Sequence, residues 1–438
     1  MARTYYIATL GCPKNEVDSA KLAGRLTASG YSATDRPEQA DLVVVNTCAF
    51  IEPAREESVE TILDLSAARR PGARLAVTGC LAERSGAELA AALPEVDVVA
   101  GFGMDLDPAA PVAVSMRARS EVPSFDLLEL PRPTSVAPWA YVKVAEGCDR
   151  RCGFCAIPSF RGKQRSRTLE SVLAEVEALE VSEVILVAQD LASFGRDLAR
   201  RGDPPSPGIV ELVEEVARRV SWVRLLYLYP SSLTDELIDT ILRTEVAYFD
   251  LSLQHVSAPL LRRMRRFGNG KRFLERIDRI RKLEPGAALR SSFILGYPGE
   301  TEEDHDDLIR FLQEAELDWA GFFSFSQEEG TYAASLEGKV DPSLALDRLV
   351  ECAEIQDGIT ARRRSSLVGS ELEVLVESAG VGRTFREAPE IDGVVRVQED
   401  LATGSFVSVL CTDSIGPDLL GEQVVAPAAS RAPAGAAS

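Results

Sequence analysis

Short apolar runs alternate with more polar, helix-compatible segments in the amino-terminal part of the chain. The apolar runs are rich in β-formers and read YYIATLGC, ADLVVVNTC and ARLAVTGC. The segments between them include NEVDSAKLAGRLTASG and PAREESVETILDLSAARR. Strands that alternate with helices predict a parallel sheet. We therefore expect an open parallel-sheet domain over residues 1–103.

The alternation stops between residues 104 and 137, where prolines gather and a linker is expected. It resumes over residues 138–366, where six segments have strand character. These are WAYVKVAEG, EVILVAQD, VRLLYLYP, YFDLSLQH, LRSSFILGYPG and DWAGFFSFSQEEG. Six such units are too many for a small sheet, so we predict a full or partial β/α barrel. The chemistry of such a barrel gathers at the C-terminal ends of its strands.

The pattern changes again after a polar helix expected near residues 343–364. The runs ELEVLVESAG, GRTFREAPEIDGVVRVQED and GSFVSVLCTD are short, β-rich and separated by turn residues. They predict a small antiparallel β-barrel over residues 367–425. Residues 426–438 are rich in Ala, Pro and Ser and bury too little apolar surface, so we expect a disordered tail. The predicted fold class is α/β.

Composition restricts the compartment and the partners. The 438 residues are 45% hydrophobic and 26% charged, as in a soluble protein of several domains. No apolar stretch approaches the roughly 20 residues of a bilayer span, and no leader pattern opens the chain, so we expect no membrane partner and a cytoplasmic location. The 48 basic and 68 acidic residues give a net charge of −20. Such a surface repels phosphate backbones unless basic residues are segregated, and it attracts basic proteins.

Three of the eight cysteines lie close together in EGCDRRCGFCAIPSF. Cys148, Cys152 and Cys155 follow the first predicted barrel strand, where a barrel has its active site. A reducing compartment favours metal ligands or catalytic thiols over disulfides. A structural zinc site usually has four ligands from paired elements, and this sequence has no second CxxC pair. Three thiolates on a four-iron cluster would instead leave one iron open.

The CxxxCxxC loop resembles that of the radical S-adenosylmethionine (SAM) family, where it follows the first strand of a partial β/α barrel. The resemblance implies that the open iron binds SAM and that an electron from the cluster cleaves it to a 5′-deoxyadenosyl radical. It also implies that Phe154 packs near the adenine and that backbone near Gly296, in FILGYPGE, approaches it. Core packing and a simple turn are the alternatives for these two residues. Gln189 and Gln254 end predicted strands and are candidate cofactor contacts or structural residues.

Cys12, Cys48 and Cys80 each end one of the amino-terminal β-rich runs. The C-terminal ends of parallel strands share one edge of a sheet, so three thiols there predict a second metal site. Small buried side chains are the alternative. Cys352 and Cys411 have no partner at ligand spacing, and we interpret them as buried apolar residues. The sequence identifies no catalytic side chain.

The amino-terminal cysteines, the CxxxCxxC barrel and the terminal β-barrel together resemble the methylthiotransferases, from Tyr5 to about Val425. The resemblance implies that the terminal barrel is an OB-like TRAM module. It implies a second [4Fe-4S] cluster on Cys12, Cys48 and Cys80, whose open iron holds the sulfur to be transferred. Two molecules of SAM and an external electron donor are then needed. One SAM methylates the sulfur, and the other makes the radical that abstracts hydrogen from the substrate carbon.

The segments LGCPKNEVDS, NTCAFIEPAREES and REAPEIDG are similar to those of family members that modify ribosomal protein S twelve, at the β-carbon of an aspartate. The members that modify tRNA typically read YGCQMN in the first segment. Gly153 and Ser252 depart from the family pattern, which has threonine or serine and proline there. The terminal module carries eleven acidic and three basic residues, the opposite of a nucleic-acid grip. We interpret Glu387, Glu390 and Asp392 as surface charges that attract a basic protein.

Two other functions stay open at this point. A tRNA methylthiotransferase, acting on a modified adenosine next to the anticodon, would share every cluster ligand. A non-catalytic iron–sulfur carrier would need no cofactor barrel. The basic run from Arg262 to Lys282 predicts a solvated helix face, or else contact with ribosomal RNA if the substrate is met on the small ribosomal subunit. The run RGKQRSR brings positive charge to where a carboxylate of SAM or of the substrate could bind.

Overall fold

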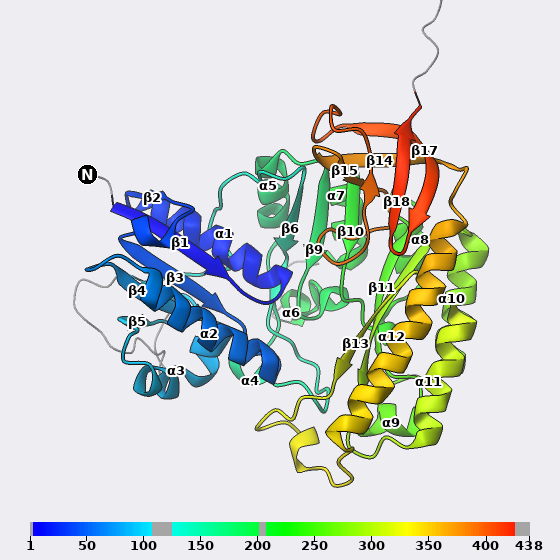
Figure 1. The fold of residues 1–438 in the computed structure, drawn as a ribbon, viewed down its shortest axis with the longest axis horizontal. Helices are drawn as coiled ribbons and strands as arrows, with labels where there is room; N and C mark the ends of the chain where they lie inside the picture. Colours follow the sequence, from blue (N-terminus) through cyan, green and yellow to red (C-terminus); the bar gives the residue numbers. More distant parts are fainter. Residues whose placement is uncertain (1–2, 107–124, 201–206, 425–438) are drawn as a thin grey trace, which may run out of the picture. The chain divides into compact units, whose positions relative to one another are not determined.

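The computed structural model describes residues 3–106, 125–200 and 207–424 (Figure 1). The chain divides into two compact units, Met1–Ile359 and Thr360–Ser438. The first unit contains a parallel sheet and a partial barrel, and the second contains a small closed barrel. The α/β fold class predicted from the sequence is confirmed.

The amino-terminal sheet has five parallel strands in the order β2-β1-β3-β4-β5. Its strands are β1 (Arg3–Thr9), β2 (Tyr31–Ala33), β3 (Leu42–Thr47), β4 (Arg74–Gly79) and β5 (Val98–Val99). Its helices are α1 (Pro13–Ala28), α2 (Glu52–Ala68) and α3 (Cys80–Ala92), with a 3-10 turn at Pro37–Gln39. The three predicted strands form the centre. The sequence pattern did not predict β2 and β5, because two or three residues are too few to show one.

Six parallel strands form the partial barrel. They are β6 (Trp139–Lys143), β9 (Glu183–Val187), β10 (Trp222–Leu225), β11 (Tyr248–Gln254), β12 (Ala288–Leu295) and β13 (Trp319–Ser324). They pair in the orders β10-β9-β6 and β11-β12-β13, and a single parallel bridge joins Leu228 to Leu251. All six predicted strand segments are present, so the predicted partial β/α barrel is confirmed.

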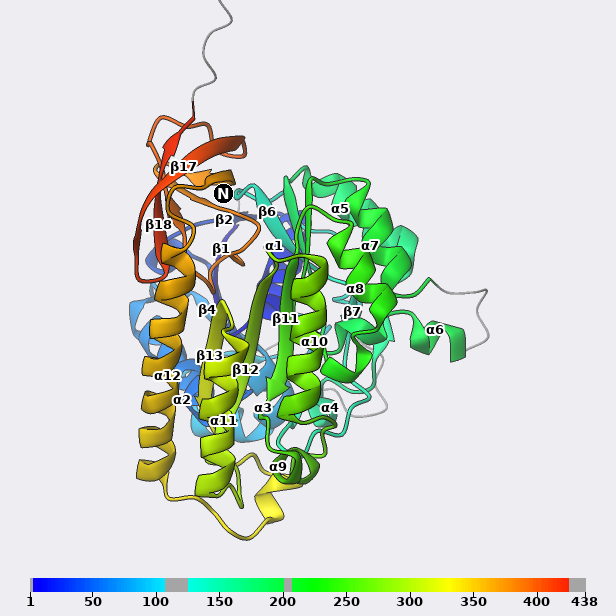
Figure 2. The same cartoon turned by 90° about the vertical axis from the view of Figure 1, so that its right-hand side faces the viewer.

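Helices cover the outside of this barrel. They are α5 (Leu169–Leu179), α7 (Ile209–Ala217), α8 (Asp235–Leu242), α10 (Gly270–Leu283), α11 (Glu302–Ala315) and α12 (Pro342–Ser365), the last being the predicted polar helix. Figure 2 shows α10 and α11 lying over β11, β12 and β13. Polar caps fix where helices begin: Thr168 and Thr234 each accept a backbone hydrogen bond, and Thr301 forms a capping box with Asp304.

Short elements fill the loops at the ends of the barrel strands. They are the antiparallel pair β7 (Ala145–Glu146) and β8 (Arg165–Ser166), the helices α4 (Ile157–Phe160), α6 (Arg196–Arg200) and α9 (Ala258–Arg263), and the 3-10 turns Leu191–Ser193, Pro230–Ser232 and Ala333–Ser335. After β13, Glu328 pairs with Arg55 at 2.5 Å and with Arg84 at 2.6 Å. This buried carboxylate ties the barrel to the amino-terminal sheet domain.

The second unit is a closed five-stranded barrel in the order β14-β15-β16-β18-β17. Its strands are β14 (Glu371–Ser378), β15 (Val381–Arg383), β16 (Val395–Arg396), β17 (Phe406–Ile415) and β18 (Asp418–Gln423). The predicted small β-barrel is confirmed. Its one parallel pair, β16 with β18, departs from the predicted antiparallel pattern, because a long loop separates β15 from β16 and brings β16 beside the last strand.

The interpretation of Glu387 as a surface charge is wrong. Its side chain is fully buried and forms an ion pair with Arg364. It also accepts hydrogen bonds from the backbone and hydroxyl of Thr384 at 2.7 and 2.8 Å. Glu387 therefore organises the loop between β15 and β16. Glu390 is exposed, whereas Asp392 is half-buried and accepts from the Ala388 N–H at 2.8 Å.

Part of the expected linker packs against the first unit. The Lys21 ammonium donates to the Leu128 carbonyl at 2.5 Å, and both Leu127 and Leu128 are buried. Residues 107–124 of that linker, and the expected tail 426–438, lie outside the described residues, and the domain boundaries stay predictions. Within the described part of the chain, no helix combines the length and apolar character needed to cross a membrane.

Candidate functional site

The barrel cysteines lie in a loop that folds back on itself. Gly147 turns the chain with φ of +77°, and a side chain there would collide with the Lys163 carbonyl. The Cys148 N–H donates to the Gly162 carbonyl at 3.1 Å. Burial raises the pKa of Cys148 to about 11 and that of Cys155 to about 12, and the charge of Cys152 adds to both shifts. The three thiols therefore lie near one another.

The amino-terminal cysteines gather at the carboxyl edge of β1, β3 and β4. Cys12 precedes α1, Cys48 follows β3, and Cys80 opens α3. Gly11 leaves room for Cys48, because a Cβ on Gly11 would be 2.8 Å from the Cys48 sulfur. Burial, together with the charges of Cys80 and Cys12, raises the pKa of Cys48 to about 11. The structure thus brings together the three cysteines that the sequence pattern places at one sheet edge.

Neither triad has the geometry of a single-ion site. Among the described residues, no three His, Cys, Asp or Glu side chains converge on one metal position. The ligands of a four-iron cluster surround a larger volume, because each thiolate binds a different iron. Three thiols at each site form a soft donor set, which suits iron–sulfur chemistry. The residues present are therefore compatible with a cluster at each triad.

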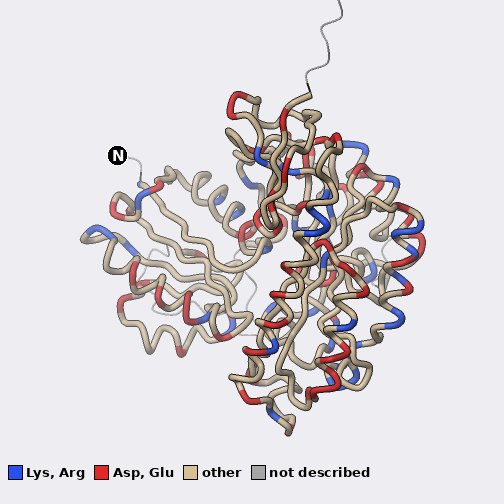
Figure 3. The backbone as a smooth tube through the Cα atoms, turned by 45° about the vertical axis from the view of Figure 1, so that its right-hand side comes forward, with Lys and Arg blue, Asp and Glu red and all other residues tan. Residues whose placement is uncertain are grey.

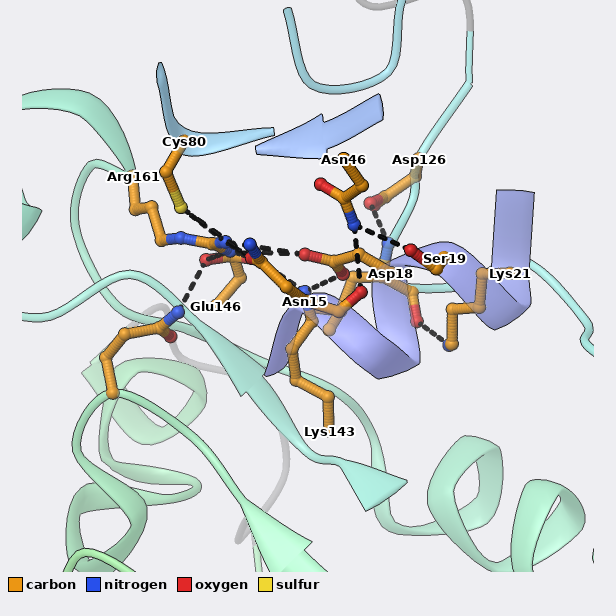
Figure 4. A network of polar contacts seen from close by, with 12 residues as sticks. Asn15, Asp18, Ser19, Lys21, Asn46, Cys80, Asp126, Lys143, Glu146 and Arg161 are labelled. Atoms are coloured by element: carbon orange, nitrogen blue, oxygen red, sulfur yellow. Dashed lines mark hydrogen bonds and ion pairs between the residues drawn. The ribbon is translucent and has the colours of Figure 1, made fainter. Parts of the chain in front are cut away.

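A buried charge network reaches Cys80 from the loop that carries the barrel cysteines (Figure 4). Arg161, six residues beyond Cys155 in the chain, donates to the Cys80 sulfur at 3.1 Å and to Asn15 Oδ1 at 2.8 Å. Its guanidinium also pairs with Glu146 at 2.9 Å. Although burial raises the pKa of Glu146, the charges of Arg161 and Lys143 hold it well below its usual range. The loop that carries the barrel cysteines thus contacts the amino-terminal site directly.

The sequence pattern predicted positive charge in this loop, but the structure shows a different partner for it. Arg161, Arg165 and Arg167 of RGKQRSR were expected near a carboxylate of SAM or substrate. They pair instead with carboxylates of the protein itself. These are Asp18 and Glu146 for Arg161, Asp126 for Arg165, and Glu129 and Glu175 for Arg167. The charges of these three arginines are therefore largely used within the fold.

Another arginine, Arg266, donates a hydrogen bond to the barrel triad, and the sequence analysis did not predict this contact. Arg266 is buried and donates to the Cys152 sulfur at 3.4 Å and to the Ser252 carbonyl. The Arg150 N–H donates to the Cys148 sulfur at 3.4 Å. The guanidinium carbons of Arg150 and Arg266 lie 4.0 and 4.2 Å from the centroid of the Tyr229 ring. The only sequence signal for the contact between Arg266 and Cys152 is that Arg266 lies in the basic run.

The rest of the basic run fits a solvated helix face. Arg276 and Arg279 of α10 pair with Asp235 at 2.6 and 3.2 Å. Figure 3 shows acidic and basic residues interspersed along the outer helices of the barrel. The pairing of these two arginines with a carboxylate is typical of a solvated helix face.

The structure shows the local surroundings of the four predicted cofactor contacts. Phe154 packs against the barrel core, and Gln189 donates to Glu146 at 3.0 Å. Gln254 has φ of +70° at an irregular end of β11. Gly296 has φ of +76°, and a Cβ there would be 2.6 Å from that of Ala345. Their contacts with SAM stay predictions.

The two departures from the family pattern have local reasons. A Cβ on Gly153 would be 2.9 Å from the Tyr297 hydroxyl and 3.1 Å from the Tyr332 ring, so a larger residue would crowd both tyrosines. The Ser252 N–H donates to the Leu228 carbonyl at 2.9 Å, next to the bridge between the two barrel sheets. Proline could not make this hydrogen bond. Cys352 is buried in the barrel core and Cys411 in the core of the second unit, as interpreted.

Family models match three parts of the chain. These are "Uncharacterized protein family UPF0004" over residues 4–101, "Radical SAM superfamily" over 142–312 and "TRAM domain" over 368–424. "Ribosomal protein uS12 methylthiotransferase RimO" of Anaeromyxobacter sp. (strain Fw109-5) is 42% identical, and the match covers 96% of this chain and 93% of that one. The chain belongs to the RimO family. The RimO of Moorella thermoacetica is 43% identical, over 95% and 98% of the two chains.

Membership of the RimO family confirms the predicted radical SAM methylthiotransferase. SAM and an iron–sulfur cluster follow from the radical SAM match. These two RimO relatives give no support to the tRNA alternative. Among solved structures, the radical SAM methyltransferase TsrM of Kitasatospora setae superposes with a TM-score of 0.49 at 14% identity, covering 82% of this chain and 89% of that one.

Proposed function

We propose that the chain transfers a methylthio group to the β-carbon of an aspartate in ribosomal protein uS12, using two [4Fe-4S] clusters. The observation that supports this most is the contact between Arg161 and Cys80. The loop that carries one cysteine triad reaches the other triad directly. A radical generated at one site and sulfur held at the other could therefore act on one substrate carbon between them.

In this proposal Cys148, Cys152 and Cys155 hold the first cluster, which when bound supplies the electron for reductive cleavage of SAM. The Arg150 N–H and the Arg266 guanidinium donate to Cys148 and Cys152. Such hydrogen bonds tune the potential at which a cluster accepts and gives an electron. Phe154, Gln189, Gln254 and Gly296 remain the proposed contacts of SAM.

Cys12, Cys48 and Cys80 would hold the second cluster and with it the sulfur to be transferred. Arg161 donates to Cys80 and is itself fixed by Asp18 and Glu146, so it positions this site relative to the barrel loop. Lys143 pairs with the same two carboxylates and balances their charge. In this proposal, the buried ion pairs of Arg161 and Lys143 with Asp18 and Glu146 lie between the two sites.

The charge of the second unit favours a basic protein partner. Its exposed acidic residues outnumber the single exposed basic residue, Arg396, over the described residues 367–424. The acidic ones are Glu371, Glu373, Glu390, Glu399, Asp400, Asp413 and Glu422. This surface repels phosphate and supports uS12 over tRNA as the substrate. The proposal also includes an external electron donor and action in the cytoplasm. Contact with RNA is proposed only on the small ribosomal subunit.

Mass spectrometry of uS12 tests the function. Cells with the intact chain should carry a methylthio group on one uS12 aspartate, and cells without it or with Cys155→Ala should carry the unmodified residue. Purified enzyme given uS12 and tRNA together separates the two candidate substrates. Methylthiolated tRNA beside unmodified uS12 would refute the proposal.

A further inference from the structure

Lys14 is a lysine without an acidic partner at the amino-terminal site. It lies in the first turn of α1, two residues after Cys12. Its ammonium lies 3.5 Å from the centroid of the Tyr227 ring, and within the described residues it forms no hydrogen bond or ion pair. The neighbouring buried lysines differ: Lys21 pairs with Glu175 at 3.2 Å, and Lys143 pairs with Asp18 and Glu146.

Asp250, the carboxylate whose charge acts on Lys14, is already occupied. Asp250 Oδ2 accepts from the Tyr227 N–H at 2.9 Å, and Asp250 Oδ1 accepts from Arg290 at 3.1 Å. An ammonium above an aromatic face is stabilised by about 0.5–2 kcal/mol, but the ring does not neutralise its charge. Lys14 can therefore offer its positive charge to an anion.

The backbone of Tyr227 is held in an uncommon conformation that supports this arrangement. Tyr227 follows β10 of the barrel and has φ of +66°, a left-handed value that costs a non-glycine residue about 1–3 kcal/mol. Its N–H bond to Asp250 fixes the turn. Lys14 is two residues from Cys12 and contacts the Tyr227 ring, so this pair joins the amino-terminal triad to the end of a barrel strand.

We propose that the Lys14 ammonium binds the side-chain carboxylate of the substrate aspartate. This inference rests on the proposed function and names the residue that selects its substrate. A carboxylate entering a partly buried site needs a cationic partner to offset its lost hydration. The carboxylate carbon is bonded directly to the β-carbon, so a cation that holds it also positions the β-carbon between the two cysteine triads.

The test compares two synthetic peptides that span the modified uS12 segment, one with the target aspartate and one with asparagine in its place. Wild-type enzyme should prefer the aspartate peptide by about 10- to 100-fold in kcat/KM, the range expected of a hydrogen bond to a charged group. Lys14→Met removes the charge but keeps a similar chain length, and it should lose most of this preference. Lys14→Arg should keep it. Lys271→Met, an exposed lysine on α10, is the matched control and should behave as wild type.

Iron and sulfide per chain, and the KM for SAM, show whether Lys14→Met acts elsewhere. Both should equal those of wild type. An unchanged aspartate-to-asparagine ratio in Lys14→Met would overturn the inference while leaving the proposed function intact. A raised KM for SAM with an unchanged peptide KM would assign Lys14 to the carboxylate of the cofactor instead and would also overturn it. If wild-type enzyme cleaves SAM but modifies neither peptide, the proposed function fails and this inference with it.

Discussion

The Arg161 guanidinium donates a hydrogen bond to the Cys80 sulfur across 3.1 Å, although 81 residues separate the two in the chain. Arg161 is buried, and its charge is balanced by Asp18 and Glu146. Removing the charge would leave buried carboxylates short of a partner, which typically costs about 3–5 kcal/mol. A substitution that keeps the charge but shortens the reach separates the role at Cys80 from the role in folding.

We expect Arg161→Lys to lower the reduction potential of the cluster that we propose at Cys80. The lysine still balances the carboxylates, but its single ammonium cannot also reach the sulfur, and a lost donor to sulfur destabilises the reduced cluster. A titration followed by electron paramagnetic resonance measures the potential. Arg167→Lys is the control, because Arg167 is equally buried and pairs with Glu175, and none of its hydrogen bonds within the described residues goes to a cysteine. Equal potentials in Arg161→Lys and wild type would contradict this role.

Substitutions in the two cysteine triads should abolish different steps of the reaction. Replacing Cys148, Cys152 or Cys155 with alanine should abolish formation of 5′-deoxyadenosine, because each supplies one of the three thiols of the CxxxCxxC loop. Replacing Cys12, Cys48 and Cys80 together should leave SAM cleavage possible but abolish methylthio transfer. Iron and sulfide should fall by about one cluster in each case. Unchanged iron in the amino-terminal triple variant would instead make these cysteines ordinary core residues.

The sequence predicted the elements whose signal is local. Strand β3 is buried along its whole length, so it appears as a continuous apolar run, and the cysteines stand where such runs end. The arginines that serve the thiols could not be predicted, because Arg266 meets Cys152 from 114 positions away. Glu387 was misinterpreted for the same reason. Its burial depends on Arg364, which lies in α12, before the β-rich segment that contains Glu387.

Gly153→Ala should destabilise the barrel loop through packing alone. The new Cβ would lie 2.9 Å from the Tyr297 hydroxyl, and overpacking of this kind typically costs about 1–3 kcal/mol. Tyr297→Phe removes that oxygen, so the alanine should cost less in the double variant. Relief will be partial, since the Arg263 carbonyl is also only 3.2 Å away. Urea unfolding of the four proteins measures the coupling, and strictly additive effects would rule out this contact.

The stability of the second unit should depend on pH through Glu387. Burial raises the pKa of Glu387, but the Arg364 charge and the Thr384 hydrogen bonds outweigh it and hold the pKa below its usual value. The folded pKa is thus below the unfolded one, so the stabilisation is complete above about pH 4.3 and is lost as pH falls through the folded value. Hydrogen exchange of β14 and β17 amides in the full chain should show this loss. Glu387→Gln should be less stable at pH 7 and nearly insensitive to acid, and a wild-type-like acid response in that variant would exclude Glu387 as the titrating group.

Charge reversal on the second unit should slow capture of uS12. Glu373, Glu399 and Asp400 are exposed, so changing all three to lysine alters the surface charge without removing a buried partner. The association rate should fall about tenfold at low salt, and the difference should shrink as salt rises, because exposed charges are screened over about 8 Å at physiological ionic strength. Glu56, Glu57 and Glu60 of α2, changed to lysine together, give the same change in net charge on the other unit. Equal slowing in both triple variants would mean that only the total charge matters. Faster binding of tRNA, followed by its modification, would favour the RNA substrate instead.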